Sequence, residues 1–141
     1  METTSSKTIN TNTSNGKRAT VRTCAIRNPE FAYVRLELTS TSPIPSGTCL
    51  DPIQVRSNLS AALTYFMGIT GNSIHPDVLK VDGPTAWVRV PNPDLHHLMA
   101  ALTSWSGWEQ DGMRYNLRAT DAGTWLGYLL NRRDEENVWK W

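Results

Sequence analysis

Aromatic and cationic residues alternate with apolar ones in four short segments of the chain. The clearest segment spans residues 31–39, where every second residue is apolar and most of the residues between them are aromatic or charged. Arginine can donate two hydrogen bonds to a phosphate, and tyrosine and tryptophan offer flat rings to unpaired bases. If the four segments are neighbouring strands, one face of their sheet could bind RNA or a partner protein. The residues expected on this face are Tyr33, Arg35, Lys80, Trp87, Arg89, Arg114 and Arg118.

The same pattern also has a purely structural explanation. An antiparallel sheet commonly has one face in contact with water, and Arg35 and Trp87 could instead pack against the last helix or against a partner protein. Residues 85–90 lack the glycine and the extra aromatic residues that mark the third strand of RNA-recognition modules. RNA binding and packing therefore both remain open from the residues alone.

Residue patterns typical of catalysis are missing. His96 and His97 are adjacent on a predicted helix, so their side chains point about 100° apart, which is poor geometry for one metal even with His75 nearby. No serine has the flanking glycines of a nucleophile elbow, and residues 67–72 lack the lysine and serine of a phosphate-binding loop. We therefore expect no stand-alone enzyme, no cofactor and no metal site.

The first 27 residues differ in composition from the rest of the chain. They are rich in serine, threonine and asparagine and carry five basic residues and one acidic residue, whereas the remainder carries nine basic and twelve acidic residues. With few large apolar residues to offset chain entropy, residues 1–27 are predicted to be a disordered basic arm. The arm is either a solvated tail or a contact for a polyanion. Its cations nearest the domain are Lys17, Arg18, Arg22 and Arg27.

The length of 141 residues predicts one domain, which we place at residues 28–133, followed by an acidic and aromatic tail over residues 134–141. The two cysteines, Cys24 and Cys49, do not suggest a disulfide framework. No apolar run approaches the roughly 20 residues that cross a bilayer. We therefore expect a soluble intracellular protein.

Two predicted helices begin with the same signal, a capping residue followed by proline. Asp51 precedes Pro52, and Asn92 precedes Pro93, in each case with an apolar stripe at helical spacing after it. The first helix should run for about four turns to a glycine at position 68. A third helix is expected after Asp121, with Trp125, Leu126, Leu129 and Leu130 on its apolar side.

Four strands complete the predicted order strand, helix, strand, strand, helix, strand, helix. This order predicts an α+β ferredoxin-like two-layer sandwich (βαββαβ plus a C-terminal helix) with a four-stranded antiparallel sheet. Its first and third strands should be neighbours, and Leu79 and Val81 should point into the core. The expected strands are residues 31–39, 78–82, 85–90 and 113–120, with a tight turn at Asp82 and Gly83.

Several stretches between about residues 29 and 130 also match a known family in spacing and residue type. They are residues 29–38, 65–68, 78–81 and 86–90, with Leu98 and Leu102 on the second helix. Through them the chain resembles the small protein subunits of eukaryotic ribonuclease P and ribonuclease MRP, specifically the eighth Pop subunit of fungi and its animal fourteen-kilodalton counterpart. The chain has Ala32 and Tyr33 where the related fifth Pop subunit has an Arg-Tyr opening.

The resemblance implies a non-catalytic nuclear and nucleolar protein. In that family the RNA subunit binds the metal ions and cleaves, in precursor tRNA 5′ leaders for ribonuclease P and in precursor ribosomal RNA for ribonuclease MRP. The implied partners are the fifth Pop subunit in a heterodimer, the large first Pop subunit, and the ribonuclease RNA; in some fungi the same proteins join telomerase RNA. Exposed apolar residues such as Trp108, Trp139 and Trp141 would serve such contacts. The alternative function is an independent single-stranded RNA-binding module that uses the open sheet face.

Overall fold

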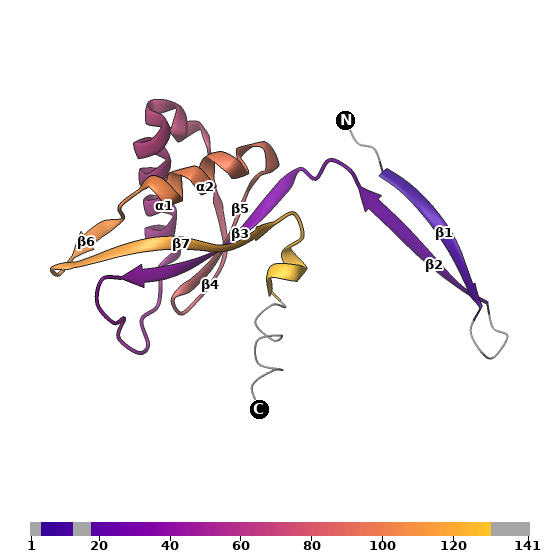
Figure 1. Ribbon diagram of the computed structural model, residues 1–141, viewed down its shortest axis with the longest axis horizontal. Helices are drawn as coiled ribbons and strands as arrows, with labels where there is room; N and C mark the ends of the chain where they lie inside the picture. Colours follow the sequence, from indigo (N-terminus) through magenta and orange to yellow (C-terminus); the bar gives the residue numbers. More distant parts are fainter. Residues whose placement is uncertain (1–3, 13–17, 131–141) are drawn as a thin grey trace. The chain divides into compact units, whose positions relative to one another are not determined.

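The computed structural model describes residues 4–12 and 18–130, which fall into two compact units, Met1–Glu30 and Phe31–Trp141. In the first unit, β1 (Thr4–Asn12) pairs with β2 (Arg18–Ile26) as an antiparallel two-stranded sheet (Figure 1). The disorder that the composition predicts for residues 1–27 stays a prediction. Threonine, isoleucine and valine favour extended backbone, and two strands so close in sequence can pair locally.

The second unit is built on a five-stranded antiparallel sheet with the order β4-β5-β3-β7-β6. As predicted, the first and third strands of the domain, β3 and β5, are neighbours, with Val34 opposite Val88. The sheet and its two crossing helices confirm the ferredoxin-like α+β sandwich. Its strands are β3 (Phe31–Ser40), β4 (Asp77–Asp82), β5 (Thr85–Pro91), β6 (Trp108–Gln110) and β7 (Met113–Gly123).

The fifth strand, β6, is an addition to the four that were predicted. It forms a hairpin with β7, in which Trp108 lies opposite Tyr115. Asp111 and Gly112 connect the two strands with φ angles of 52° and 74°. Positive φ at both positions is the requirement of the type I′ turn, for which Asp-Gly is a preferred pair. An Asp-Gly signal in the sequence therefore accounts for a strand that the alternation alone did not reveal.

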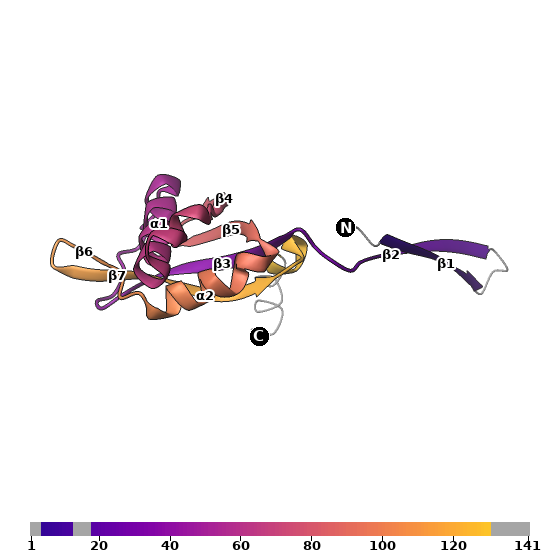
Figure 2. The same ribbon diagram turned by 90° about the horizontal axis from the view of Figure 1, so that it is seen from above.

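Two helices cross one face of the sheet (Figure 2): α1 (Pro52–Met67) and α2 (Leu95–Ser104). The predicted start of α1 is confirmed, because the Asp51 carboxylate accepts a hydrogen bond of 3.1 Å from the backbone N–H of Ile53. The second start differs: residues Asn92–Asp94 form a 3₁₀ turn, η2, and the α-helix begins only at Leu95. A further 3₁₀ segment, η1 (Gly68–Ser73), follows α1.

The hydrophobic core lies between these helices and the sheet. Ala32, Val34 and Leu36 of β3 are fully buried there, as the alternation predicts. On β4 the prediction fails in part, because Leu79 is 40% exposed while Val78 and Val81 pack against the core. A β-bulge between Val78 and Lys80 adds one residue to the strand and turns Leu79 outward.

The end of the domain also differs from the prediction. Asp121 does not cap a helix; it lies within β7, which is longer than expected and pairs with β3 up to Gly123. A second bulge, where Thr120 is the extra residue, lies in this part of β7. The chain is helical again over residues 126–130, and we call this segment the C-terminal turn. The predicted tail, residues 134–141, with Trp139 and Trp141, lies outside the described residues.

No helix within residues 4–12 and 18–130 is long and apolar enough to span a membrane.

Candidate functional site

The structure brings the central residues of the predicted binding face together. Arg35 of β3 lies opposite Trp87 of β5 on one side and opposite Asp121 of β7 on the other, and Tyr33 lies opposite Arg89. Because the alternate residues of β3 enter the core with the helices, these side chains belong to the other face of the sheet. We call this the outer face.

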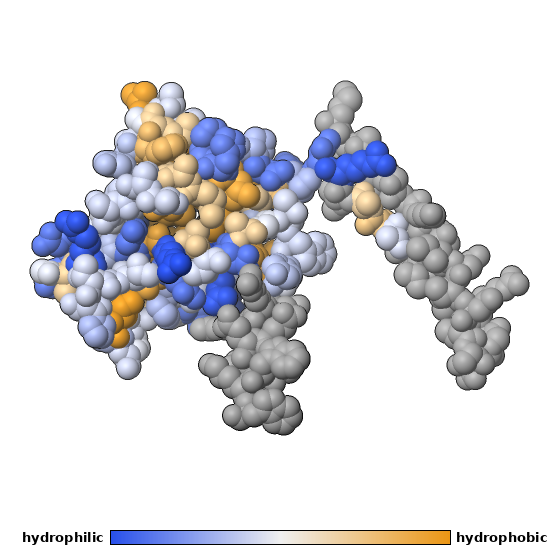
Figure 3. All heavy atoms as spheres, viewed as in Figure 1, coloured by the Kyte–Doolittle hydropathy of each residue, from blue (hydrophilic) through white to orange (hydrophobic). Residues whose placement is uncertain are grey.

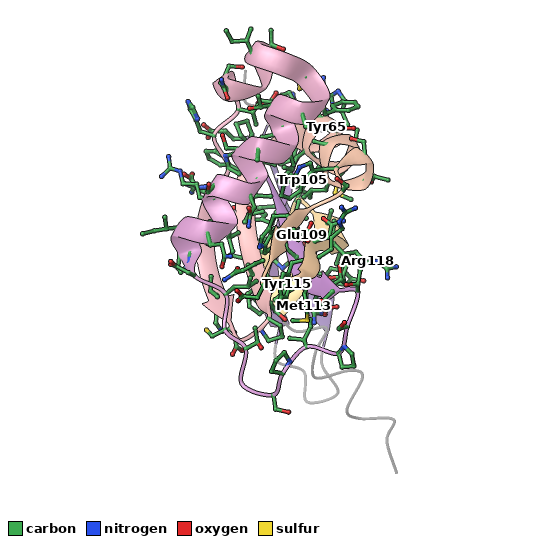
Figure 4. All side chains as sticks on the ribbon, turned by 90° about the vertical axis from the view of Figure 1, so that its left-hand side faces the viewer. Tyr65, Trp105, Glu109, Met113, Tyr115 and Arg118 are labelled. Atoms are coloured by element: carbon green, nitrogen blue, oxygen red, sulfur yellow. The ribbon has the colours of Figure 1, made fainter. Side chains whose placement is uncertain are left out.

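The remaining three predicted residues lie around this centre. Lys80 of β4 lies opposite Trp87, and its ammonium nitrogen is 5.3 Å from the centroid of that ring. Arg118 lies opposite Glu37 and projects outward from β7 in Figure 4. Arg114, opposite Glu109 of β6, is exposed near the start of β7, away from the centre of the outer face. All seven predicted side chains are therefore on the sheet, but they do not share one compact site.

At the centre of the outer face Trp87 is buried, and the side chain of Arg35 beside it is mostly buried. Trp87 is only 3% exposed, and the side chain of Arg35 is 12% exposed. Nη2 of Arg35 donates a hydrogen bond of 3.2 Å to the Glu37 carboxylate, whereas Nε of Arg35 and Nε1 of Trp87 are buried without a hydrogen-bond partner among the described residues. A base cannot stack on Trp87 in this conformation, which favours the packing explanation for the centre of the face.

Arg89 has a structural role at the edge of the same face. It forms an ion pair with Asp77 at 2.9 Å, and its guanidinium carbon lies 4.5 Å from the centroid of the Phe31 ring. Together with Glu37 and Asp121, the Asp77 carboxylate places acidic groups between the cations of the outer face. This mixture of charges weakens the attraction of the face for a polyanion.

The predicted basic arm is described only in part. Lys17 lies outside the described residues, Arg18 and Arg22 fall on β2, and Arg27 is exposed. A contact of these four residues with a polyanion remains a prediction.

Trp108, which was expected as an exposed contact residue, is half-buried in an aromatic stack. Its ring lies 6.1 Å from Trp105 and 5.7 Å from Tyr115, with interplanar angles of 24° and 23°. The three rings pack against the core and join the end of α2 to the β6–β7 hairpin. Figure 4 labels Trp105 and Tyr115 of this stack. Its role is therefore structural.

Two exposed apolar groups were missed by the sequence analysis. The first, at the end of α1 and in η1, contains Tyr65, Phe66 and Ile69, which are 68%, 46% and 85% exposed. We call it the α1-end patch; apolar atoms are visible at this tip of the molecule at the top of Figure 3. The second is in and beside the C-terminal turn and consists of Trp125, Tyr128 and Leu130.

The α1-end patch could have been found from the sequence. Residues 65–67 are all large and apolar or aromatic, and another large apolar residue follows at position 69. A helix that buries one stripe cannot bury four such residues so close together. Phe66 falls at helical spacing with the apolar stripe of α1, yet it is exposed.

A comparison with models of protein families assigns the chain to a family. Residues 30–105 match the family model described as "Ribonucleases P/MRP protein subunit Pop8". The chain belongs to the Pop8 family. The Pop8 match begins just before β3 and ends at Trp105, directly after α2. It therefore includes the α1-end patch but not the C-terminal turn.

A solved structure shares the fold of this chain. A chain of the structure titled "Cryo-EM structure of yeast Ribonuclease MRP" superposes with a TM-score of 0.59 and 18% sequence identity, over 78% of this chain and 95% of that one. At 18% identity this similarity shows the fold alone. No curated protein matches the chain.

Proposed function

We propose that the chain is a non-catalytic structural subunit of the ribonuclease P and ribonuclease MRP ribonucleoproteins. The observation that carries the proposal is the Pop8 family match across β3, α1, β4, β5 and α2. In this role the chain helps to hold the ribonuclease RNA in shape, and so supports 5′ processing of precursor tRNA and processing of precursor ribosomal RNA in the nucleus and nucleolus. Cleavage itself is assigned to the RNA.

The proposed protein partner is the related fifth Pop subunit, in a heterodimer that also meets the large first Pop subunit. The α1-end patch is the surface that we assign to the heterodimer, because it is apolar, exposed and within the family match. Aromatic side chains are enriched at the centres of protein interfaces, where they bury a large area with few rotatable bonds. Contact with the RNA through the basic arm is a second, separate part of the proposal.

Size-exclusion chromatography of the purified chain, alone and mixed with the fifth Pop subunit, tests the heterodimer. We expect the two proteins to elute together, earlier than either alone. Separate elution of both proteins at micromolar concentration, with each of them folded, would count against the proposed partner.

Replacing Ile69 with glutamate is expected to weaken this complex at least tenfold, which corresponds to about 1.4 kcal/mol. The side chain is 85% exposed in the isolated chain, so a carboxylate should not harm the fold, but it would lose its hydration in an apolar interface. Isothermal titration calorimetry with the fifth Pop subunit measures the effect.

The matched control is Ile53→Glu, at the opposite end of α1. Ile53 is 77% exposed, so the two substitutions place the same charge at similar exposure, one in the first turn of α1 and one in η1 just after its end. The control should leave the affinity unchanged. An unchanged affinity for Ile69→Glu, or an equal loss for both variants, would remove the α1-end patch from the interface.

The second candidate function is an independent single-stranded RNA-binding module. The adjacency of Arg35, Lys80 and Trp87 on the outer face favours it, because these residues combine phosphate donors with a ring on which a base could stack once Trp87 is exposed. This function requires an affinity for single-stranded RNA that falls steeply as salt rises. If fluorescence anisotropy detects no salt-sensitive binding of a single-stranded oligonucleotide, the candidate is excluded.

A further inference from the structure

Two large apolar side chains are buried without belonging to the core. Trp87 is 3% exposed and Leu129 is 1% exposed, yet neither belongs to the cluster of buried residues between the helices and the sheet. Trp87 lies on the outer face, because its neighbours in β5, Ala86 and Val88, point into the core. A tryptophan in the middle of a bare sheet face would keep much more of its ring exposed, so another part of the chain must cover it.

The C-terminal turn is the segment in position to do so. In Figure 1, α1 and α2 lie above the sheet and the yellow turn that follows β7 lies below it. The pairing of β7 with β3 ends where Gly123 lies opposite Tyr33, so the turn begins beside the outer face. Leu129 is the one residue of this turn that is fully buried.

We propose that the C-terminal turn is a displaceable cover of the outer face, which closes over Trp87 and Arg35 and is fastened by Leu129. In the closed state the centre of the outer face is covered, and the chain presents Trp125 and Tyr128 to solvent, at 71% and 54% exposure. In the open state Trp87 and Arg35 become accessible, next to Lys80.

The exposure of most side chains in and beside the turn indicates that it is weakly held. Leu130, next to the buried Leu129, is 40% exposed. Closure therefore depends mainly on the burial of one leucine and of the tryptophan beneath it.

Closure also leaves two donors without partners. Nε of Arg35 and Nε1 of Trp87 are buried and make no hydrogen bond with the described residues. Both groups would bond to water if the turn moved away, and a buried donor without a partner opposes the burial that created it. Apolar burial that is offset by two unsatisfied donors is the balance expected of a segment that opens while the core stays folded.

Solvent exchange of the Trp87 indole N–H, followed by NMR on the full chain, tests the cover. The signal is assigned by its loss in Trp87→Phe. We expect Leu129→Asp to speed this exchange at least tenfold, because a carboxylate cannot remain buried against the ring, while the amide protons of β3 and α1 keep their protection. Leu130→Asp, at the exposed neighbouring position, is the control and should leave the indole exchange unchanged.

Two outcomes would overturn the proposal. If the Trp87 indole stays as protected in Leu129→Asp as in the unaltered chain, the turn is not what covers it. If Leu129→Asp unfolds the whole domain, with loss of protection in β3 and α1, the turn is part of the core rather than a displaceable cover. Leu129→Ala should speed the exchange of the Trp87 indole N–H less than Leu129→Asp does. If the aspartate variant does not express, the alanine variant tests the cover instead.

Discussion

Replacing Trp87 with alanine is expected to lower the free energy of unfolding by about 3 kcal/mol, the lower end of the range for buried tryptophan. The ring is 3% exposed, and its loss leaves a cavity between β5 and the segment that covers the outer face. The lower end applies because the ring lies outside the main core, where a short segment can partly collapse into the space. Urea unfolding followed by circular dichroism measures the change.

Trp87→Phe is the control for this substitution. It keeps an aromatic ring under the cover and removes the unpartnered Nε1, so we expect a loss of about 1 kcal/mol. While the C-terminal turn covers the ring, neither variant should change the affinity of the intact chain for single-stranded RNA. Full stability of Trp87→Ala together with weaker RNA binding would instead identify Trp87 as an exposed stacking platform.

Replacing Gly107 with alanine is expected to cost about 2–4 kcal/mol, from overpacking and from an unfavourable φ combined. The φ angle of Gly107 is +82°, and a Cβ there would overlap the carbonyl oxygen of Tyr115 and lie 2.9 Å from its carbonyl carbon. The chain passes this close to β7 where it leaves α2 to form β6. Thermal unfolding should show the loss as a clearly lower midpoint.

Gly112→Ala separates the two causes. Gly112 has a similar φ of +74°, but a Cβ there would meet nothing within 4 Å, so only the backbone term of about 1 kcal/mol should appear. Equal losses for the two variants would show that the contact with Tyr115 relaxes at no cost.

The parts of the fold with strong local signals were predictable from sequence. Asp51 and Pro52 fixed the start of α1, and the alternation of β3 identified both its core side and its pairing with β5. The bulges at Leu79 and Thr120 were not predictable, because inserting one residue into a strand leaves no distinct pattern. They account for the outward turn of Leu79 and for the place of Asp121 within β7.

The sequence predicts which residues belong to the candidate site, but not how exposed they are. Alternation shows that Arg35 and Trp87 share a face, but not what lies over that face, because covering it depends on a distant segment. Burial of Trp87 is a tertiary result of this kind, whereas the exposure of Tyr65 and Ile69 follows from the excess of large apolar residues at the end of α1. They shift the interpretation of the outer face from RNA platform to packed surface, and they move the expected partner contact to the end of α1.

Affinity purification of the tagged full chain from its own cells, followed by sequencing of the bound RNA and mass spectrometry of the bound proteins, tests directly whether it is a ribonucleoprotein subunit. We predict strong enrichment of the RNA of ribonuclease P, of ribonuclease MRP or of both, together with the fifth Pop subunit, and loss of these partners in Ile69→Glu but not in Ile53→Glu. Recovery of a folded, expressed chain without either RNA and without any Pop subunit would contradict the proposed function.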